Sequence, residues 1–295
     1  MNLIAFALLI IASVCIGGMA ECRKAFQVRN GTGLKTTLAF SAINSAIAAV
    51  ICCFFINGYH FDIGRTGLSL LYAVVTIVIS SLCLVGSAWG NVTILVACAN
   101  LGGLVFPSLY GVITNPADNK MSVLRIIGFV FALACIAIIF WDGKSDKQSF
   151  KFKISCVLVF FVQGSALIIF SIIDKYFGTV QYFNFMAEYM LITTVLLIPL
   201  IFILGKKNKT PQKSKVFTKF NFLYAAIYAV LFFASEYLSL KCVSLVPLTF
   251  QAPVSFCIPI IVIALFEKLI YGIKISKSEL WQIAFAMVSC ICFIF

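Results

Sequence analysis

The chain has 295 residues, of which 62% are hydrophobic and 11% charged, and its mean hydropathy is +1.10. A soluble protein of this length carries about a quarter charged residues, so the composition excludes a water-soluble globular domain and predicts an integral membrane protein. The net charge of +12 does not indicate a nucleic-acid partner, because the basic residues gather in loops between apolar runs, where they would face anionic lipid.

Apolar runs separated by polar interruptions predict ten membrane-spanning helices, since a crossing needs roughly 20 apolar residues. In chain order they lie near residues 2–22, 36–56, 66–86, 91–112, 122–141, 154–174, 183–204, 221–240, 246–266 and 278–295. The first run is followed, and not preceded, by Lys and Arg residues, which favours a retained first helix over a cleaved signal peptide. The fold class is therefore predicted as an all-α integral membrane protein.

The basic residues are distributed unevenly between the two ends of these helices. The connections after the odd-numbered helices hold 17 of the 22 Lys and Arg residues, and those after the even-numbered helices hold 5. Because basic loops are retained on the cytoplasmic side, the odd-numbered connections are predicted to be cytoplasmic and both termini external. The predicted location is the plasma (inner) membrane, crossed several times.

An internal repeat emerges when the chain is shifted along itself by 152 residues. Residues 80–107 then overlay 232–259 without a gap, and Pro107 falls on Pro259. The chain divides into a first five-helix repeat over 1–142, a cytoplasmic linker over 143–153 and a second five-helix repeat over 154–295. Because each half has an odd number of crossings, the halves form a 5+5 inverted-topology repeat, an arrangement that places a substrate site at the interface between the halves.

Acidic residues inside the apolar runs are the first candidates for function, since charge inside a membrane is costly. Glu236 in the eighth helix is either a site for a proton or a cationic substrate, or the partner of Lys241 or Lys175 in an ion pair at the outer interface. For Glu188, nearer the outside, a structural ion pair is the preferred interpretation and a coupling or gating role the alternative.

Two further acids, Glu21 and Asp174, are predicted to close the first and sixth helices, where they would form local ion pairs with Arg23 and Lys175. They occupy nearly equivalent points of the two halves. That equivalence makes a gate the alternative interpretation for them.

Uncharged polar residues inside the runs are cheaper to bury and often join neighbouring helices. Asn100 and Gln251 stand out because they occupy nearly the same place in the two halves. Gly102 and Gly103 beside Asn100, and Pro253 beside Gln251, are expected to loosen these helices, and such matched interruptions point to a transporter site. Close packing of small residues is the alternative.

The sequence contains no recognisable catalytic motif, and the protein is therefore predicted not to be an enzyme. His60 is the one histidine, no Cys-x-x-Cys pair occurs, and neither a phosphate-binding Gly-rich motif nor a His-Glu-x-x-His motif is present. No metal or cofactor is implied.

The pattern resembles the drug/metabolite transporter superfamily, in its ten-helix, EamA-like branch. The resemblance spans the chain and is most visible from Leu245 to Lys268, with Pro247 and Pro253 in the ninth helix and Glu267 at the acid of the family's Gly-Glu pair.

In this family the first, third, fourth, sixth, eighth and ninth helices surround a central cavity, and the two halves rock to give alternating access. The resemblance therefore implies that the cavity holds Asn100, Gln163, Glu236, Tyr237 and Gln251. The expected function is secondary transport of a small metabolite or amphipathic compound, coupled to protons or cations if Glu236 is a carrier. The alternative is a membrane scaffold or assembly protein that transports nothing.

Overall fold

The structure is a computed structural model that describes residues 3–30, 34–56, 58–90, 92–114, 122–141, 150–177, 181–207, 219–243, 248–272 and 277–292. These residues form ten helices and no strand: α1 (Leu3–Asn30), α2 (Leu34–Cys53), α3 (Ile63–Trp89), α4 (Val92–Thr114), α5 (Val123–Trp141), α6 (Phe150–Phe177), α7 (Tyr182–Lys207), α8 (Lys219–Val243), α9 (Leu248–Tyr271) and α10 (Lys277–Cys292). Within the described part, α1, α2, α3, α4, α7 and α8 are long and apolar enough to cross a membrane. The all-helical class is thereby confirmed and a membrane location is supported.

The end of the first helix differs from the prediction. α1 continues to Asn30 and includes the basic residues that the sequence placed in a loop after residue 22. Arg and Lys are good helix formers, and no Gly or Pro interrupts the chain between Gly18 and Gly31. A change from apolar to basic residues therefore marks the approach to the membrane surface and not the end of the helix. Glu21 consequently lies inside α1 and does not close it.

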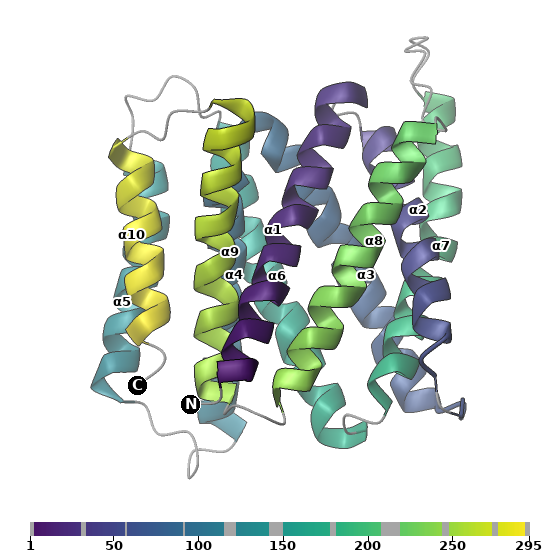
Figure 1. The fold of residues 1–295 in the computed structure, drawn as a ribbon, viewed down its shortest axis with the longest axis horizontal. Coiled ribbons are helices and arrows are strands. Elements are labelled where there is room, and N and C mark those ends of the chain that lie inside the picture. Colours follow the sequence, from purple (N-terminus) through teal and green to yellow (C-terminus); the bar gives the residue numbers. More distant parts are fainter. Residues whose placement is uncertain are drawn as a thin grey trace.

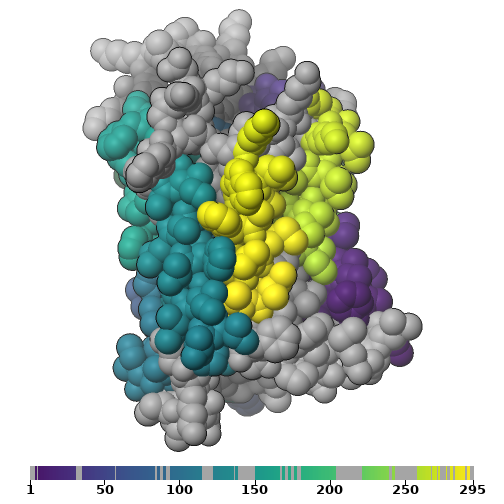
Figure 2. Space-filling model, turned by 90° about the vertical axis from the view of Figure 1, so that its left-hand side faces the viewer, coloured from purple at the N-terminus to yellow at the C-terminus, as the bar shows by residue number. Residues whose placement is uncertain are grey.

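The helices stand roughly side by side (Figure 1), with α5 and α10 at one end of the row and α2 and α7 at the other. Between these ends, α1 packs against α8 and α9, whereas α6 packs against α3 and α4. α2 also contacts α8, and α3 contacts α7. Figure 2 shows the end face, where α5 and α10 lie next to each other along their lengths. Elements of the two predicted halves are thus interleaved throughout the structure.

Small side chains contribute many of the contacts between the helices, together with large ones such as Phe40 and Phe185. Ala39, Ala49 and Ala73 are almost fully buried. Many large aliphatic residues are nevertheless exposed on the outer face, Val195 among them. Small residues between helices and an apolar outer face fit a bilayer, where helices associate by close approach of their backbones and the outer face meets lipid.

Gly102 illustrates this close approach at the contact between α4 and α6. A Cβ atom at Gly102 would lie 1.9 Å from the backbone oxygen of Phe160, and one at Gly164 would lie 2.2 Å from the ring of Phe106. Gly102 therefore allows close packing of α4 on α6, and the loosening of the helix that the sequence suggested stays a prediction.

Replacing Gly102 with alanine is expected to destabilise the protein by about 1–3 kcal/mol, because the backbone of α6 has to move away from α4. Gly67 is the matched control, since it lies in α3 with nothing within 4 Å of its would-be Cβ. Gly67→Ala should be neutral or slightly stabilising, because alanine is the better helix former. Thermal unfolding in detergent measures both. Equal midpoints for the two variants would contradict the assigned packing.

Candidate functional site

The largest polar network described in the structure centres on Arg65 and Glu188. Asp62 caps the N-terminus of α3 by accepting a hydrogen bond from the backbone N–H of Arg65 at 2.9 Å. This cap fixes Arg65 in the first turn of the helix. Glu188 lies nearly two turns into α7, which packs against α3. The side chains of Arg65 and Glu188 are 1% and 8% exposed, so the ion pair at the centre of the network is buried in the protein.

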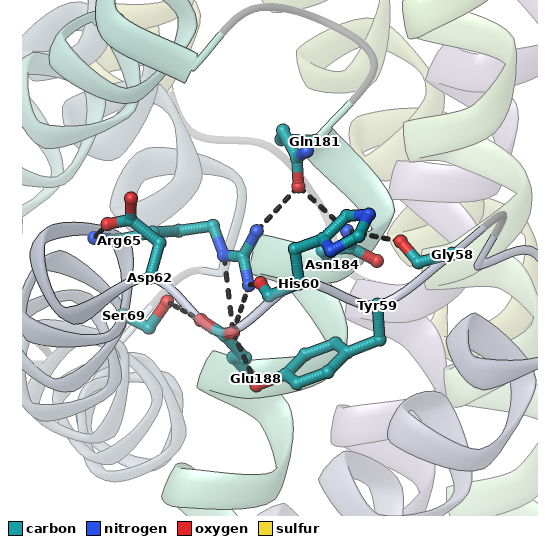
Figure 3. Close-up of polar contacts among 9 residues, drawn as sticks. All are labelled: Gly58, Tyr59, His60, Asp62, Arg65, Ser69, Gln181, Asn184 and Glu188. Carbon is teal, nitrogen blue, oxygen red and sulfur yellow. Dashed lines mark hydrogen bonds and ion pairs between the residues drawn. The ribbon is translucent and has the colours of Figure 1, made fainter.

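Glu188 is satisfied at both carboxylate oxygens (Figure 3). Arg65 donates to Oε1 from Nη2 at 2.6 Å and from Nε at 3.2 Å. Tyr59 donates to the same oxygen at 2.9 Å, and Ser69 donates to Oε2 at 3.0 Å. The carboxylate therefore has a counter-ion and a full set of donors, the condition under which a buried ion pair is tolerated.

The remaining contacts of Arg65 are with residues just before α3 and α7. Nη1 donates to Gln181 Oε1 at 2.5 Å, and Nη2 donates to the backbone oxygen of His60 at 2.5 Å. Asn184 donates to Gln181 Oε1 at 2.7 Å and to the backbone oxygen of Gly58 at 3.4 Å. The network thus ties the segment before α3, in the first predicted half, to the start of α7, in the second.

Glu236 lies in α8 in a different environment. Tyr182 of α7 donates a hydrogen bond to its Oε2 at 2.5 Å. Tyr72 of α3 and Tyr189 of α7 lie within electrostatic range. No Lys or Arg in the described part of the chain lies within ion-pair distance of this carboxyl. The sequence suggested Lys241 and Lys175 as partners of this carboxyl. The Nζ atom of Lys241 lies 5.5 Å from the ring centroid of Tyr237. The side chain of Lys175 is outside the described residues.

Four aromatic rings pack beside Glu236. Phe55 precedes α3, Phe183 lies at the start of α7, and Phe233 and Tyr237 flank Glu236 in α8. Their centroids lie between 4.6 and 6.4 Å apart. Tyr237, a predicted site residue, thus belongs to an aromatic cluster that again joins the two halves.

Arg23 in α1 is a second cation that the sequence assigned to a loop. It donates a hydrogen bond to the hydroxyl of Tyr228 in α8, and its guanidinium carbon lies 4.9 Å from the centroid of that ring. Glu21 lies two residues before Arg23 in α1, a spacing at which side chains on a helix do not face each other, so their local ion pair stays a prediction. About two turns beyond Arg23 along α1, Asn30 exchanges hydrogen bonds with Asn221 of α8 at 2.9 and 2.8 Å.

The other predicted site residues are only partly placed. Asn100 in α4 and Gln163 in α6 are partly buried, and Glu21 is buried in α1. Gln251 lies in α9, which packs against α4, but its side chain is outside the described residues, as is that of Asp174 in α6. The pairing of Asn100 with Gln251 therefore stays a prediction.

The described residues contain no cluster of potential metal ligands. Among them, no group of three or more His, Cys, Asp or Glu side chains could hold a metal ion. The cysteines described are free thiols, most of them buried among apolar side chains.

Comparison with known proteins supports the fold alone. No protein-family model matches the chain, and no curated protein matches its sequence. Among the solved structures that match the chain is one described as "Crystal structure of protein", with a TM-score of 0.59 and 13% sequence identity over 98% of this chain and 96% of that one. At this identity the likeness shows a shared fold. The resemblance to EamA-like transporters stays a prediction.

Proposed function

We propose that the protein is a secondary transporter of the plasma (inner) membrane that moves a small metabolite or amphipathic compound by alternating access. In this proposal the chain crosses the bilayer ten times in two inverted five-helix halves. The resemblance to EamA-like transporters leads to the same proposal, on the residues given above. Glu236 is its coupling residue for a proton or a cation.

The packing of the helices supports the inverted repeat. If each helix of one half is replaced by its counterpart five places along the chain, the contact of α1 with α8 becomes that of α6 with α3. In the same way, α1 with α9 becomes α6 with α4, and α2 with α8 becomes α7 with α3, and all of these contacts occur. The pairs α2 with α7 and α5 with α10 map onto themselves. Two halves related by a two-fold axis in the membrane plane would pack in this manner.

Glu236 is the observation that carries the proposal. It is an acid inside a membrane-spanning helix, near tyrosines of α3 and α7, and without a basic partner among the described residues. A carboxyl that only stabilises the fold is expected to be paired, as Glu188 is with Arg65. An acid left without a cation at the interface between the halves suits a group that takes up a proton or a cation during transport.

The Arg65–Glu188 network fits the same scheme as a gate. It lies where α3 and α7 begin, the side that the distribution of basic residues assigns to the outside. It joins one half to the other, as does the aromatic cluster of Phe55, Phe183, Phe233 and Tyr237. We interpret these two contacts as the closed outer side of the transporter, which has to open once in each cycle.

Reconstitution into liposomes tests the proposal. A screen of small metabolites by thermal stabilisation of the purified protein identifies binders, because a ligand that binds only the folded state raises its stability. The binders are then offered to liposomes with and without a pH gradient. Accumulation in protein-containing liposomes, and not in empty ones, is the expected result. Binding without any flux would overturn the transport proposal.

A scaffold without transport is the alternative, and water access to Glu236 separates the two. Cys98 is not a suitable probe, since it is fully buried between α4 and α6. The Glu236→Cys variant is expected to react with a membrane-impermeant thiol reagent. The wild type, treated in the same way, measures the background labelling of the native cysteines. Complete protection of this thiol would favour the scaffold. A reporter fused to the C-terminus tests the external orientation.

A further inference from the structure

Arg23 is set among three helices from both halves. It projects from α1 toward α8, where the hydroxyl of Tyr228 accepts its hydrogen bond and the ring of Tyr228 lies against the guanidinium. The thiol of Cys83 in α3 lies within hydrogen-bonding range of the guanidinium. Arg23 therefore does not extend into a cytoplasmic loop. It lies between the layer that holds α1 and α8 and the layer that holds α3.

The guanidinium of Arg23 has no counter-ion among the described residues. No carboxylate there lies within ion-pair distance, and the contacts from Tyr228 and Cys83 use only part of its N–H donors. Arg65 provides the contrast within the same molecule, since Glu188, Gln181 and the His60 carbonyl accept from all of its side-chain nitrogens. An uncompensated charge packed between helices is costly unless a ligand compensates it.

Arg23 also borders the interface that holds Glu236. Tyr228 and Glu236 lie on one side of α8, eight residues and thus about 12 Å apart along its axis. Tyr189 of α7 lies within electrostatic range of both. The side chains of Arg23 and Glu236 are both partly buried.

We propose that Arg23 binds an anionic group, a carboxylate or a phosphate, on the molecule that the protein carries. A guanidinium donates two parallel hydrogen bonds to either group, and the free N–H donors of Arg23 suit such a contact. The Tyr228 ring, packed against the guanidinium, holds it in place. This inference rests on the proposed transport function and narrows its cargo to organic anions or zwitterions. The same chemistry would bind a lipid phosphate, but Cys83 and Tyr228 place the guanidinium toward protein.

Binding in nanodiscs tests the assignment without any transport measurement. Wild type and Arg23→Gln are placed in neutral phosphatidylcholine nanodiscs, and thermal stabilisation is followed as inorganic phosphate or succinate is added, with chloride as the control for ionic strength. We expect both probes to stabilise the wild type and Arg23→Gln to need about tenfold more of either, the loss that follows removal of a charged hydrogen bond. Arg29→Gln, a second basic residue of α1, is the matched control and should behave as wild type.

The outcomes separate this inference from simpler roles and from the proposed function. Equal stabilisation of wild type and Arg23→Gln, or none of the wild type, would overturn it. Stabilisation by anionic phosphatidylglycerol alone would assign Arg23 to lipid and also contradict it. If Arg23 only ties α1 to α8, Arg23→Gln and Tyr228→Phe lower the midpoint in the absence of probe and leave the increment from the probe unchanged. Anion binding without flux would leave the inference standing and refute transport.

Discussion

Replacing Glu188 with alanine is expected to lower the free energy of unfolding by about 3–5 kcal/mol, because it leaves the guanidinium of Arg65 buried without a counter-ion. Arg65 is 1% exposed, so water cannot replace the lost carboxylate. Tyr59 and Ser69 lose their acceptor at the same time. The cost therefore combines an uncompensated charge with unsatisfied donors.

Thermal unfolding of purified variants measures this effect, and a double variant separates charge from packing. Glu188→Gln keeps an acceptor but loses the charge, so it should fall between wild type and Glu188→Ala. Arg65→Leu combined with Glu188→Leu removes both charges and should be less destabilised than either single variant, since an apolar pair of similar volume often replaces a buried ion pair at little cost. Additive losses in the double variant would contradict a direct coupling between the two residues.

The helices could be predicted from the sequence because the length and spacing of apolar runs determine them. Their ends were harder to predict. α1 continues eight residues beyond the predicted end at residue 22, because charge alone does not end a helix. The length of α1 explains why Arg23 was assigned to a loop, and thus why its contact with Tyr228 was missed. Membrane depth and helix length are separate properties, and the distribution of basic residues reports only the first.

The ion pair of Arg65 with Glu188 could not be predicted, since its members lie 123 positions apart and meet only when α3 packs on α7. One signal was present in the sequence. Arg65 is the single Lys or Arg between Lys35 and Lys120, at the edge of a long uncharged stretch. An isolated cation beside one membrane-spanning segment and an acid such as Glu188 near the start of another are candidates for an ion pair between the two halves.

Asn100 and Gly102 show the limit of reasoning from matched positions. The sequence treats them as one interruption of the fourth helix. The structure places Gly102 against the backbone of α6 and Asn100 partly buried on the same helix. A glycine in a membrane helix serves close packing as readily as it serves flexibility, and only the position of the neighbouring backbone distinguishes the two.

Glu236→Gln is expected to abolish accumulation driven by a pH or cation gradient, with at least about a tenfold loss of the driven rate, because an amide cannot exchange a proton or bind a cation by charge. The substitution keeps the size of the side chain and an acceptor for Tyr182, so folding should be little affected. Uptake of a cargo found in the binding screen, measured in liposomes with a pH gradient or a sodium gradient, gives the rate. The gradient that Glu236→Gln no longer uses identifies the coupling ion.

Two variants keep this experiment specific to the charge of Glu236. Glu236→Asp retains an ionisable group and should retain part of the driven uptake. Tyr182→Phe removes the hydrogen-bond donor but leaves the carboxyl, so it should alter the pH dependence of uptake without abolishing coupling. If Glu236→Gln accumulates cargo with the pH and sodium dependence of the wild type, the acid has no coupling role. Its isolation from basic residues would then have to be explained by Tyr182 and the aromatic cluster alone.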